Sequence, residues 1–145
     1  MNNKVILLVE DDEDHEELTL LALEQANIKN EVVVVRDGAE ALDYLFNTGS
    51  YEGQDTKIPQ LILMDLKLPK IDGIEVLRRL RAGEKTKLLP VVILTSSTEE
   101  RDIVNGYTFG ANSYIRKPVD FDKFTDAVQR LGLYWLTLNQ LAPSK

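Results

Sequence analysis

The chain has 145 residues, enough for one domain with a full core, and it contains no cysteine and a single histidine, His15. Disulfides, thiolate metal sites and multi-histidine metal sites are therefore excluded. The formal net charge of -7 argues against non-specific nucleic-acid binding and against adhesion to anionic membranes. No apolar stretch has the length of a signal-peptide core or of a membrane span, so we expect a cytoplasmic protein with no membrane partner.

The chain alternates between two kinds of segment, and the first kind is a short, continuous apolar run. Such runs are typical of parallel strands that are buried on both faces. Taken in chain order, they predict strands over 5–9, 32–35, 61–64, 91–94 and 114–116.

The second kind of segment carries apolar residues at helical spacing. Taken in chain order, these segments predict helices over 14–27, 38–46, 74–80, 103–107 and 121–128. Leu21 and Phe46 are among the residues expected to face the core. Asp37 and Asp120 stand where they would cap the second and the fifth helix, and a polar loop is expected over 47–59.

Five strands that alternate with five helices predict an α/β fold, with one parallel sheet, helices on both of its faces and right-handed crossovers. We expect a single domain over 1–131. The stretch 132–145 is predicted to be an apolar extension of the last helix, and an exposed apolar stripe usually marks a protein interface. The alternative is a tail that folds back over the edge of the sheet.

Polar residues follow the carboxyl ends of several predicted strands. Glu10 and Asp11 follow the first strand, Asp65 follows the third, Thr95 follows the fourth, and Lys117 follows the fifth. Ligands of open parallel sheets bind beyond the carboxyl ends of the strands. We therefore expect these side chains to meet in one pocket.

Carboxylates in such a pocket repel one another, by roughly 4 kcal/mol for two charges about 4 Å apart at an effective dielectric near 20. A pocket of this kind either raises the pKa values of its acids or binds a cation. An all-oxygen set of ligands suits Mg²⁺. Because Lys117 adds a positive charge for an anionic group, the pocket is predicted to handle phosphoryl groups, with Asp65 as the nucleophile.

Residues 10–17, EDDEDHEE, contain seven acids in eight positions. Asp12 is expected to be a helix cap rather than a further pocket acid, and His15 is expected to be a solvated helix residue without a role. A solvated helix N-terminus favours acids, which explains the remaining members of the segment, Glu13, Asp14, Glu16 and Glu17.

Four segments, ILLVEDD, LILMDLKLPKIDG, VVILTSS and GANSYIRKP, resemble in order and spacing the signature segments of the two-component response-regulator receiver domain. The resemblance implies a flavodoxin-like (βα)5 fold with a five-stranded parallel sheet in the order 2-1-3-4-5. It also implies a phosphorelay signalling protein that accepts a phosphoryl group from a sensor histidine kinase. Such a protein is not an enzyme beyond Mg²⁺-dependent self-phosphorylation and slow autodephosphorylation.

The resemblance implies a role for each acid of the pocket. Asp65 would be the phosphoacceptor, Asp11 the direct Mg²⁺ ligand and Glu10 the second acid of the metal pair. The backbone carbonyl of Lys67 would complete the protein's share of the metal shell. Glu10 stands where an Asp is common in the family, and its greater length favours contact through water.

The resemblance also implies a switch. Thr95 would hydrogen-bond the phosphoryl group and Lys117 would pair with it, while Tyr114 would turn inward as Thr95 moves. The output surface would be the fourth helix, the fifth strand and the fifth helix. A cis Lys117-Pro118 bond is expected, and Lys67 and Ser97 occupy positions that tune phosphoryl lifetime in the family.

The loop over 47–59 and the GLYWL segment of the tail also resemble the small regulators that pair with cyanobacterial and bacterial phytochromes. This resemblance implies a phytochrome-type kinase as partner and a homodimer formed through the last helix and the 132–145 tail. No output or DNA-binding domain follows, so we expect a stand-alone receiver.

Three other functions are compatible with parts of this pattern. A haloacid-dehalogenase-type phosphohydrolase would place a second Asp two residues after the nucleophile, where this chain has Lys67. A flavin-binding module would need a phosphate loop after the first strand, where EDDED would repel phosphate. A degenerate receiver that is never phosphorylated is disfavoured by the complete set of Asp11, Asp65, Thr95 and Lys117.

Overall fold

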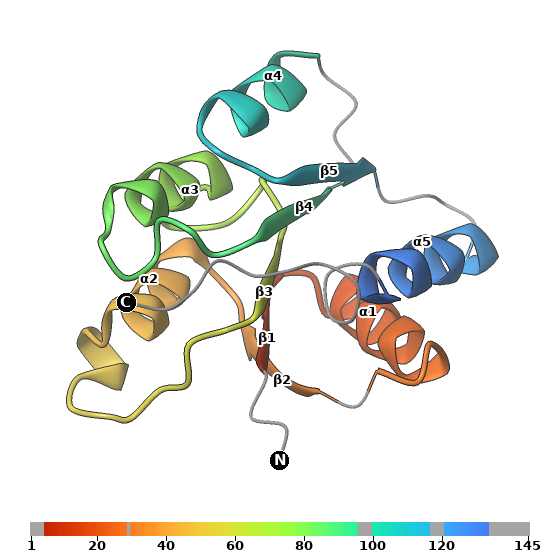
Figure 1. The fold of residues 1–145 in the computed structure, drawn as a ribbon, viewed down its shortest axis with the longest axis horizontal. Coiled ribbons are helices and arrows are strands. Elements are labelled where there is room, and N and C mark those ends of the chain that lie inside the picture. Colours follow the sequence, from red (N-terminus) through yellow and green to blue (C-terminus); the bar gives the residue numbers. More distant parts are fainter. Residues whose placement is uncertain (1–4, 29, 96–99, 117–120, 134–145) are drawn as a thin grey trace.

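The computed structural model describes residues 5–28, 30–95, 100–116 and 121–133. Within these residues, strands and α-helices alternate, with one short 3-10 helix (η1) after the second α-helix (Figure 1). In chain order the elements are β1 Val5–Val9, α1 Glu13–Gln25, β2 Glu31–Val35, α2 Gly38–Phe46, η1 Gly49–Tyr51, β3 Leu61–Met64, α3 Gly73–Ala82, β4 Val91–Thr95, α4 Glu100–Thr108, β5 Ser113–Arg116 and α5 Phe121–Leu133.

The strands form one parallel sheet in the order β2-β1-β3-β4-β5, which confirms the predicted fold class and strand order. Figure 1 shows α1 and α5 on one face of the sheet and α2, α3 and α4 on the other. Side chains alternate between the faces of a strand, so Leu7 and Val9 of β1 join the core under α2 and α3, whereas Ile6 and Leu8 join the core under α1 and α5. All residues of β1, β3 and β4 are buried, as continuous apolar runs predict.

Two residues predicted to face the core do not lie there. Leu21 is 42% exposed, because Ala22 and Leu23 occupy the core face of α1. Phe46 is 38% exposed, because it ends α2 and its ring lies against Gly83 at the protein surface rather than under the sheet.

The stretch 47–59, predicted as a loop, contains η1 and is held by specific contacts. The rings of Tyr44 and Tyr51 meet edge to face at 5.3 Å, and the Tyr44 hydroxyl donates a hydrogen bond of 2.8 Å to the Lys57 carbonyl. The side-chain amide of Asn47 donates to the Gln54 carbonyl at 2.9 Å and to the Thr56 hydroxyl at 2.8 Å. Burial raises the pKa of the Tyr44 hydroxyl above its ordinary value.

Aspartates begin three of the helices. Asp12 caps α1 and Asp37 caps α2, as predicted, and Asp72 caps α3 by accepting the backbone N–H of Glu75 at 3.0 Å. Asp120 lies outside the described residues. None of the described helices combines the length and the apolar character that crossing a membrane would require.

Candidate functional site

The first feature of the site is a pair of buried carboxylates at the ends of adjacent strands. Parallel pairing sets Val9 of β1 beside Met64 of β3, so Glu10 and Asp65 follow at the same level. The Asp65 backbone N–H donates to the Val9 carbonyl at 3.1 Å, which fixes this register. Glu10 is 2% exposed and Asp65 is 8% exposed. Two acids are thus held where water screens their charges poorly.

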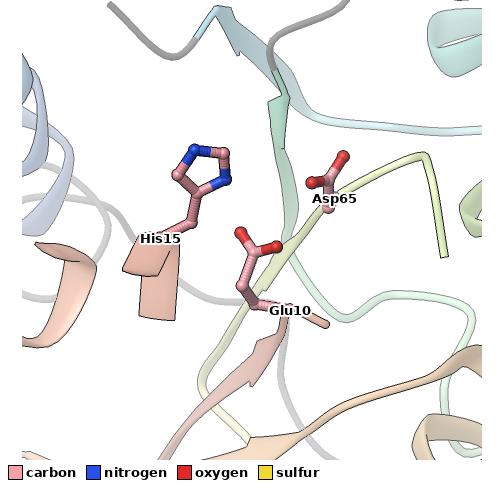
Figure 2. Close-up of side chains that lie close together, drawn as sticks. All are labelled: Glu10, His15 and Asp65. Atoms are coloured by element: carbon pink, nitrogen blue, oxygen red, sulfur yellow. The ribbon is translucent and has the colours of Figure 1, made fainter. Parts of the chain in front are cut away.

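His15 joins these two acids. Glu10, His15 and Asp65 each offer one atom able to bind a metal, and these atoms all lie within 4.8 Å of one another. Figure 2 shows the His15 ring, carried by the first turns of α1, turned toward the space beside Glu10 and Asp65. His15 lies in α1 with a side chain that is 39% exposed, as expected for a solvated helix residue, but the prediction did not include the approach of its ring to the two acids.

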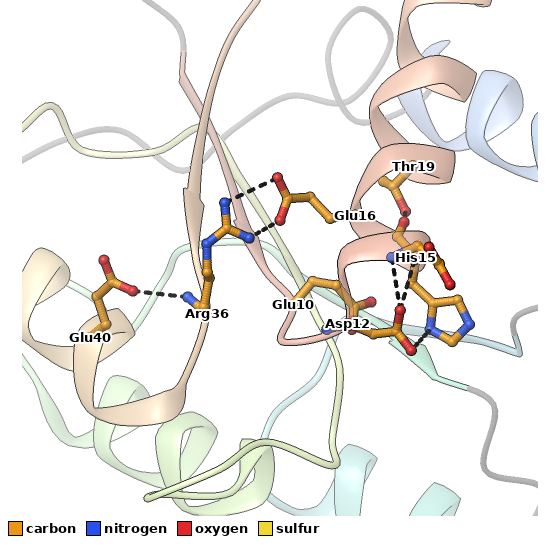
Figure 3. Close-up of polar contacts among 8 residues, drawn as sticks. Glu10, Asp12, His15, Glu16, Thr19, Arg36 and Glu40 are labelled. Atoms are coloured by element: carbon orange, nitrogen blue, oxygen red, sulfur yellow. Dashed lines mark hydrogen bonds and ion pairs between the residues drawn. The ribbon is translucent and has the colours of Figure 1, made fainter.

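The segment between Glu10 and His15 is shaped by its own backbone contacts (Figure 3). The Asp12 backbone N–H lies 3.3 Å from the Glu10 carboxylate. The Asp12 carboxylate accepts the N–H groups of Asp14 at 2.8 Å and of His15 at 3.2 Å, which confirms the predicted cap. Of the other acids, Glu16 pairs with Arg36, and that hydrogen bond raises the pKa of the guanidinium.

The loop between β3 and α3 wraps the other side of Asp65. The Lys67 backbone N–H donates to the Asp65 carboxylate at 3.1 Å, which orients that side chain. Gly73 lets the loop fold back closely, because a Cβ at this position would lie 2.5 Å from the Asp65 carbonyl oxygen. The loop borders an open hollow lined also by Asp11, Asp72 and Asp102. The Lys67 ammonium lies 3.5 Å from the Asp102 carboxylate on α4.

The remaining predicted residues lie at the ends of the next two strands. Thr95 ends β4 and is fully buried. Tyr114 of β5 is partly buried, pairs in register with Ile93, and packs against the core under α2 and α3. Lys117, Pro118 and Ser97 lie outside the described residues, so their predicted roles remain predictions.

The structure therefore brings together Glu10 and Asp65, with Asp11 exposed in the adjoining hollow. Two buried carboxylates, an exposed carboxylate and a nearby backbone carbonyl form a set of hard oxygen donors, which fits a divalent cation such as Mg²⁺. The sequence analysis did not place His15 near these acids. The available signal was a histidine five residues after a strand-end acid, at a helix start.

Comparisons with known proteins agree with this geometry. The family model of the response regulator receiver domain matches residues 6–129. The probable methanogenesis regulatory protein FilR2 of Methanothrix harundinacea (strain 6Ac) is 39% identical over 136 residues, which cover 94% of this chain and 86% of FilR2. Response regulator Rcp1 of Synechocystis sp. is 38% identical over 133 residues, covering 92% of this chain and 89% of Rcp1.

Solved structures of response regulators are also similar to this chain. The phosphorylated cyanobacterial phytochrome response regulator RcpA superposes with a TM-score of 0.90 at 38% identity, covering 98% of this chain and 100% of RcpA. The Mn²⁺-bound form of Rcp1 has a TM-score of 0.88 at 37% identity, and the match covers 97% of this chain and 99% of Rcp1. The bacteriophytochrome response regulator AtBRR is 50% identical with a TM-score of 0.77, and the match covers 97% of this chain and 100% of AtBRR.

Proposed function

Because the chain belongs to the response regulator receiver domain family, we propose that it accepts a phosphoryl group on Asp65 from the phosphohistidine of a sensor kinase, in a Mg²⁺-dependent reaction. The observation that carries this proposal is the placement of Asp65 beside Glu10 at adjacent strand ends, both buried and within reach of one cation.

Phosphoryl transfer forms a bond between an Asp65 oxygen and phosphorus as the donor's P–N bond breaks, and the imidazole nitrogen of the kinase leaves with the electron pair. The Lys67 N–H bond to Asp65 Oδ1 holds the carboxylate in a defined orientation for this attack. Glu10, Asp11, Asp65 and the Lys67 carbonyl would hold Mg²⁺. The bound ion would supply positive charge to the transferring group.

The switch follows from charge. An aspartyl phosphate carries about two negative charges where the free carboxylate carries one. This charge draws the Thr95 hydroxyl and the Lys117 ammonium toward it, and the space that Thr95 leaves can accept the ring of Tyr114. The output surface is then formed by α4, β5 and α5. The protein acts by changing this surface and catalyses no reaction on a separate substrate.

The proposed partner is a phytochrome-type histidine kinase. Its support is the high identity to regulators described as phytochrome or bacteriophytochrome response regulators, which this chain matches over almost its whole length.

We further propose a cytoplasmic homodimer that forms through α5 and the apolar 132–145 segment. Size-exclusion chromatography of the full chain should show a dimer, and removal of 132–145 should give a monomer. A full chain that elutes as a monomer, with or without phosphorylation, would contradict the dimer.

Incubation with acetyl phosphate and Mg²⁺ tests the central proposal. The wild-type protein should shift on a gel that retards phosphoproteins, and chelation of Mg²⁺ should abolish the shift. Asp65→Asn preserves the size of the side chain but removes its nucleophilic carboxylate, and it should not shift. Asp55→Asn, at an exposed position of the 47–59 segment, is the control and should still shift. Equal labelling of wild type and Asp65→Asn would overturn the assignment.

A further inference from the structure

The position of His15 bears on which cations the pocket binds. Its ring reaches the same space as Glu10 and Asp65, with one donor atom of each residue within 4.8 Å of the other two (Figure 2). Two ligands of one tetrahedral ion, each about 2.1 Å from it, lie about 3.4 Å apart, so side-chain rotations that shorten the separations by up to about 1.4 Å bring all three atoms into one coordination shell.

The chemistry of the donors differs from that of an all-oxygen pocket. Carboxylates, carbonyls and waters suit Mg²⁺, which binds imidazole poorly, whereas Zn²⁺ and other late first-row ions bind imidazole nitrogen well. Two carboxylates and one imidazole, with a water in the fourth position, make a set that Zn²⁺ accepts in tetrahedral geometry.

The local structure holds His15 on the pocket side. Its backbone N–H donates to the Asp12 carboxylate at 3.2 Å, and its ring nitrogen Nδ1 lies 3.8 Å from the other oxygen of the same carboxylate (Figure 3). Its carbonyl accepts the Thr19 hydroxyl at 2.8 Å in the next turn of α1. A ring restrained near a carboxylate keeps its orientation toward a metal better than a ring in open solvent.

We propose that His15 is a third side-chain ligand beside Glu10 and Asp65, and that it gives the pocket a Zn²⁺-binding mode that competes with Mg²⁺. Zn²⁺ bound in this way takes the place beside Asp65 that the proposed Mg²⁺ would occupy. The inference rests on the proposed cation pocket, but metal binding is measured without phosphoryl transfer, so the two can fail separately.

The test uses tag-free protein, in which His15 is the only histidine and therefore the only source of imidazole signals in an NMR spectrum. Zn²⁺ should shift the His15 ring signals in a saturable titration, and Mg²⁺ should not. In calorimetric titrations, His15→Ala should weaken Zn²⁺ binding by at least about tenfold, since even outer-shell partners of metal ligands contribute about that much. It should leave Mg²⁺ binding unchanged.

Two further variants provide controls. The double variant His15→Ala, Glu17→His restores a histidine at an exposed position of the same helix and should not restore Zn²⁺ binding. Asp65→Asn should weaken the binding of both ions. Unmoved ring signals, or equal Zn²⁺ affinity with and without His15, would overturn the inference. If Zn²⁺ binds as described but acetyl phosphate labels no residue, the proposed function fails and the metal site stands.

Discussion

At the scale of single residues, the β3–α3 loop depends on the absence of a side chain at Gly73. An added methyl would lie 2.5 Å from the Asp65 carbonyl oxygen and 2.8 Å from the Leu66 Cα, and neither backbone atom can move without shifting the loop. Gly73→Ala should lower the free energy of unfolding by about 1–3 kcal/mol, as overpacking does, and should slow labelling by acetyl phosphate. Urea denaturation and a labelling time course measure the two effects.

Gly53→Ala is the comparison for that variant, because nothing lies within 4 Å of its added methyl. Its positive φ of 75° makes some loss of stability expected there too, but labelling should proceed at the wild-type rate. Slow labelling by Gly53→Ala, or wild-type labelling by Gly73→Ala, would contradict the role given to the loop.

Glu75 gives a prediction about pH. Hydrogen bonds from Arg78, and then from Arg79, lower the pKa of Glu75 from its ordinary value of 4.5 to about 2. A lowered carboxyl pKa stabilises the folded state above the unfolded pKa, and this stabilisation is lost as the pH falls toward the folded value. Thermal melts should therefore show Glu75→Gln to be less stable than wild type near pH 7, with a difference that narrows between pH 4.5 and 2.

The same melts on proteins that lack both arginines supply the control. When Arg78 and Arg79 are each replaced by Met, the change in melting temperature caused by Glu75→Gln should be the same at pH 4.5 and at pH 2. A difference between wild type and Glu75→Gln that is constant from pH 7 to 2 would be inconsistent with the ion pairs.

Which residues form the site could be predicted only in part at this scale. Glu10 and Asp65 were identifiable because each directly follows a continuous apolar strand, and parallel strands bring their carboxyl ends together. His15 was not identifiable, because its approach to Asp65 depends on the direction in which α1 leaves β1. The weak amphipathic pattern of α1, which also misplaced Leu21, does not fix that direction.

At the scale of elements, Arg81 joins α3 to the segments around β4 and β5. Its guanidinium donates to the carbonyls of Lys87, Leu89 and Gly110 at 2.7–2.9 Å and to the Asn112 side chain at 3.0 Å. Burial lowers the pKa of this guanidinium. Arg81→Ala should lower the free energy of unfolding in urea by about 2 kcal/mol, the size of one good hydrogen bond to a charged group.

Two further substitutions on α3 show whether the loss of stability in Arg81→Ala comes from the charge or from the hydrogen bonds of the guanidinium. Arg81→Lys keeps the charge but lacks the planar guanidinium with its several N–H donors, so it should recover only part of the lost free energy of unfolding. Arg78→Ala removes an exposed arginine that pairs with Glu75, and it should lower the stability less than Arg81→Ala does. If Arg81→Ala is no more harmful than Arg78→Ala, the anchoring role is wrong.

The Lys67–Asp102 pair joins the β3–α3 loop to α4. Both residues line the hollow beside Asp11, and their charged groups are 3.5 Å apart. A double-mutant cycle of Lys67→Met and Asp102→Asn should give a coupling of about 0.2–1 kcal/mol in the unmodified protein. Saturation with beryllofluoride should reduce this coupling, because the added negative charge at Asp65 attracts Lys67.

Lys70 and Asp37 form a matched pair, since Lys70 belongs to the same loop, the separation is also 3.5 Å and the exposures are similar. Its coupling should not respond to beryllofluoride. A Lys67–Asp102 coupling that is equally insensitive would argue against a link between Asp65 and α4.

The elements themselves were largely predictable. The bounds of β1, β3 and α2 match the expected ranges, because continuous apolar runs and an aspartate cap mark their ends without ambiguity. The order of the strands does not follow from periodicity and came from the family resemblance. The structure of 47–59 was missed because it depends on the contact between Tyr44 and Tyr51, which no local pattern encodes.

At the scale of the whole molecule, the fold gathers acids from separated parts of a chain with a net charge of -7. Glu10 and Asp65 are 55 positions apart in the sequence, and the pairing of β1 with β3 makes them neighbours. A bound divalent cation would offset the repulsion between these two acids, so the same arrangement provides the proposed site for Mg²⁺ and phosphate.

The most direct test of this account is to locate the phosphoryl group. Wild-type protein treated with acetyl phosphate and Mg²⁺ is reduced with borohydride, which converts an aspartyl phosphate to homoserine, and its peptides are sequenced by mass spectrometry. The account predicts homoserine at position 65 alone, and none when Mg²⁺ is chelated. Homoserine at another aspartate with Asp65 intact, or unchanged labelling without a divalent ion, would contradict it.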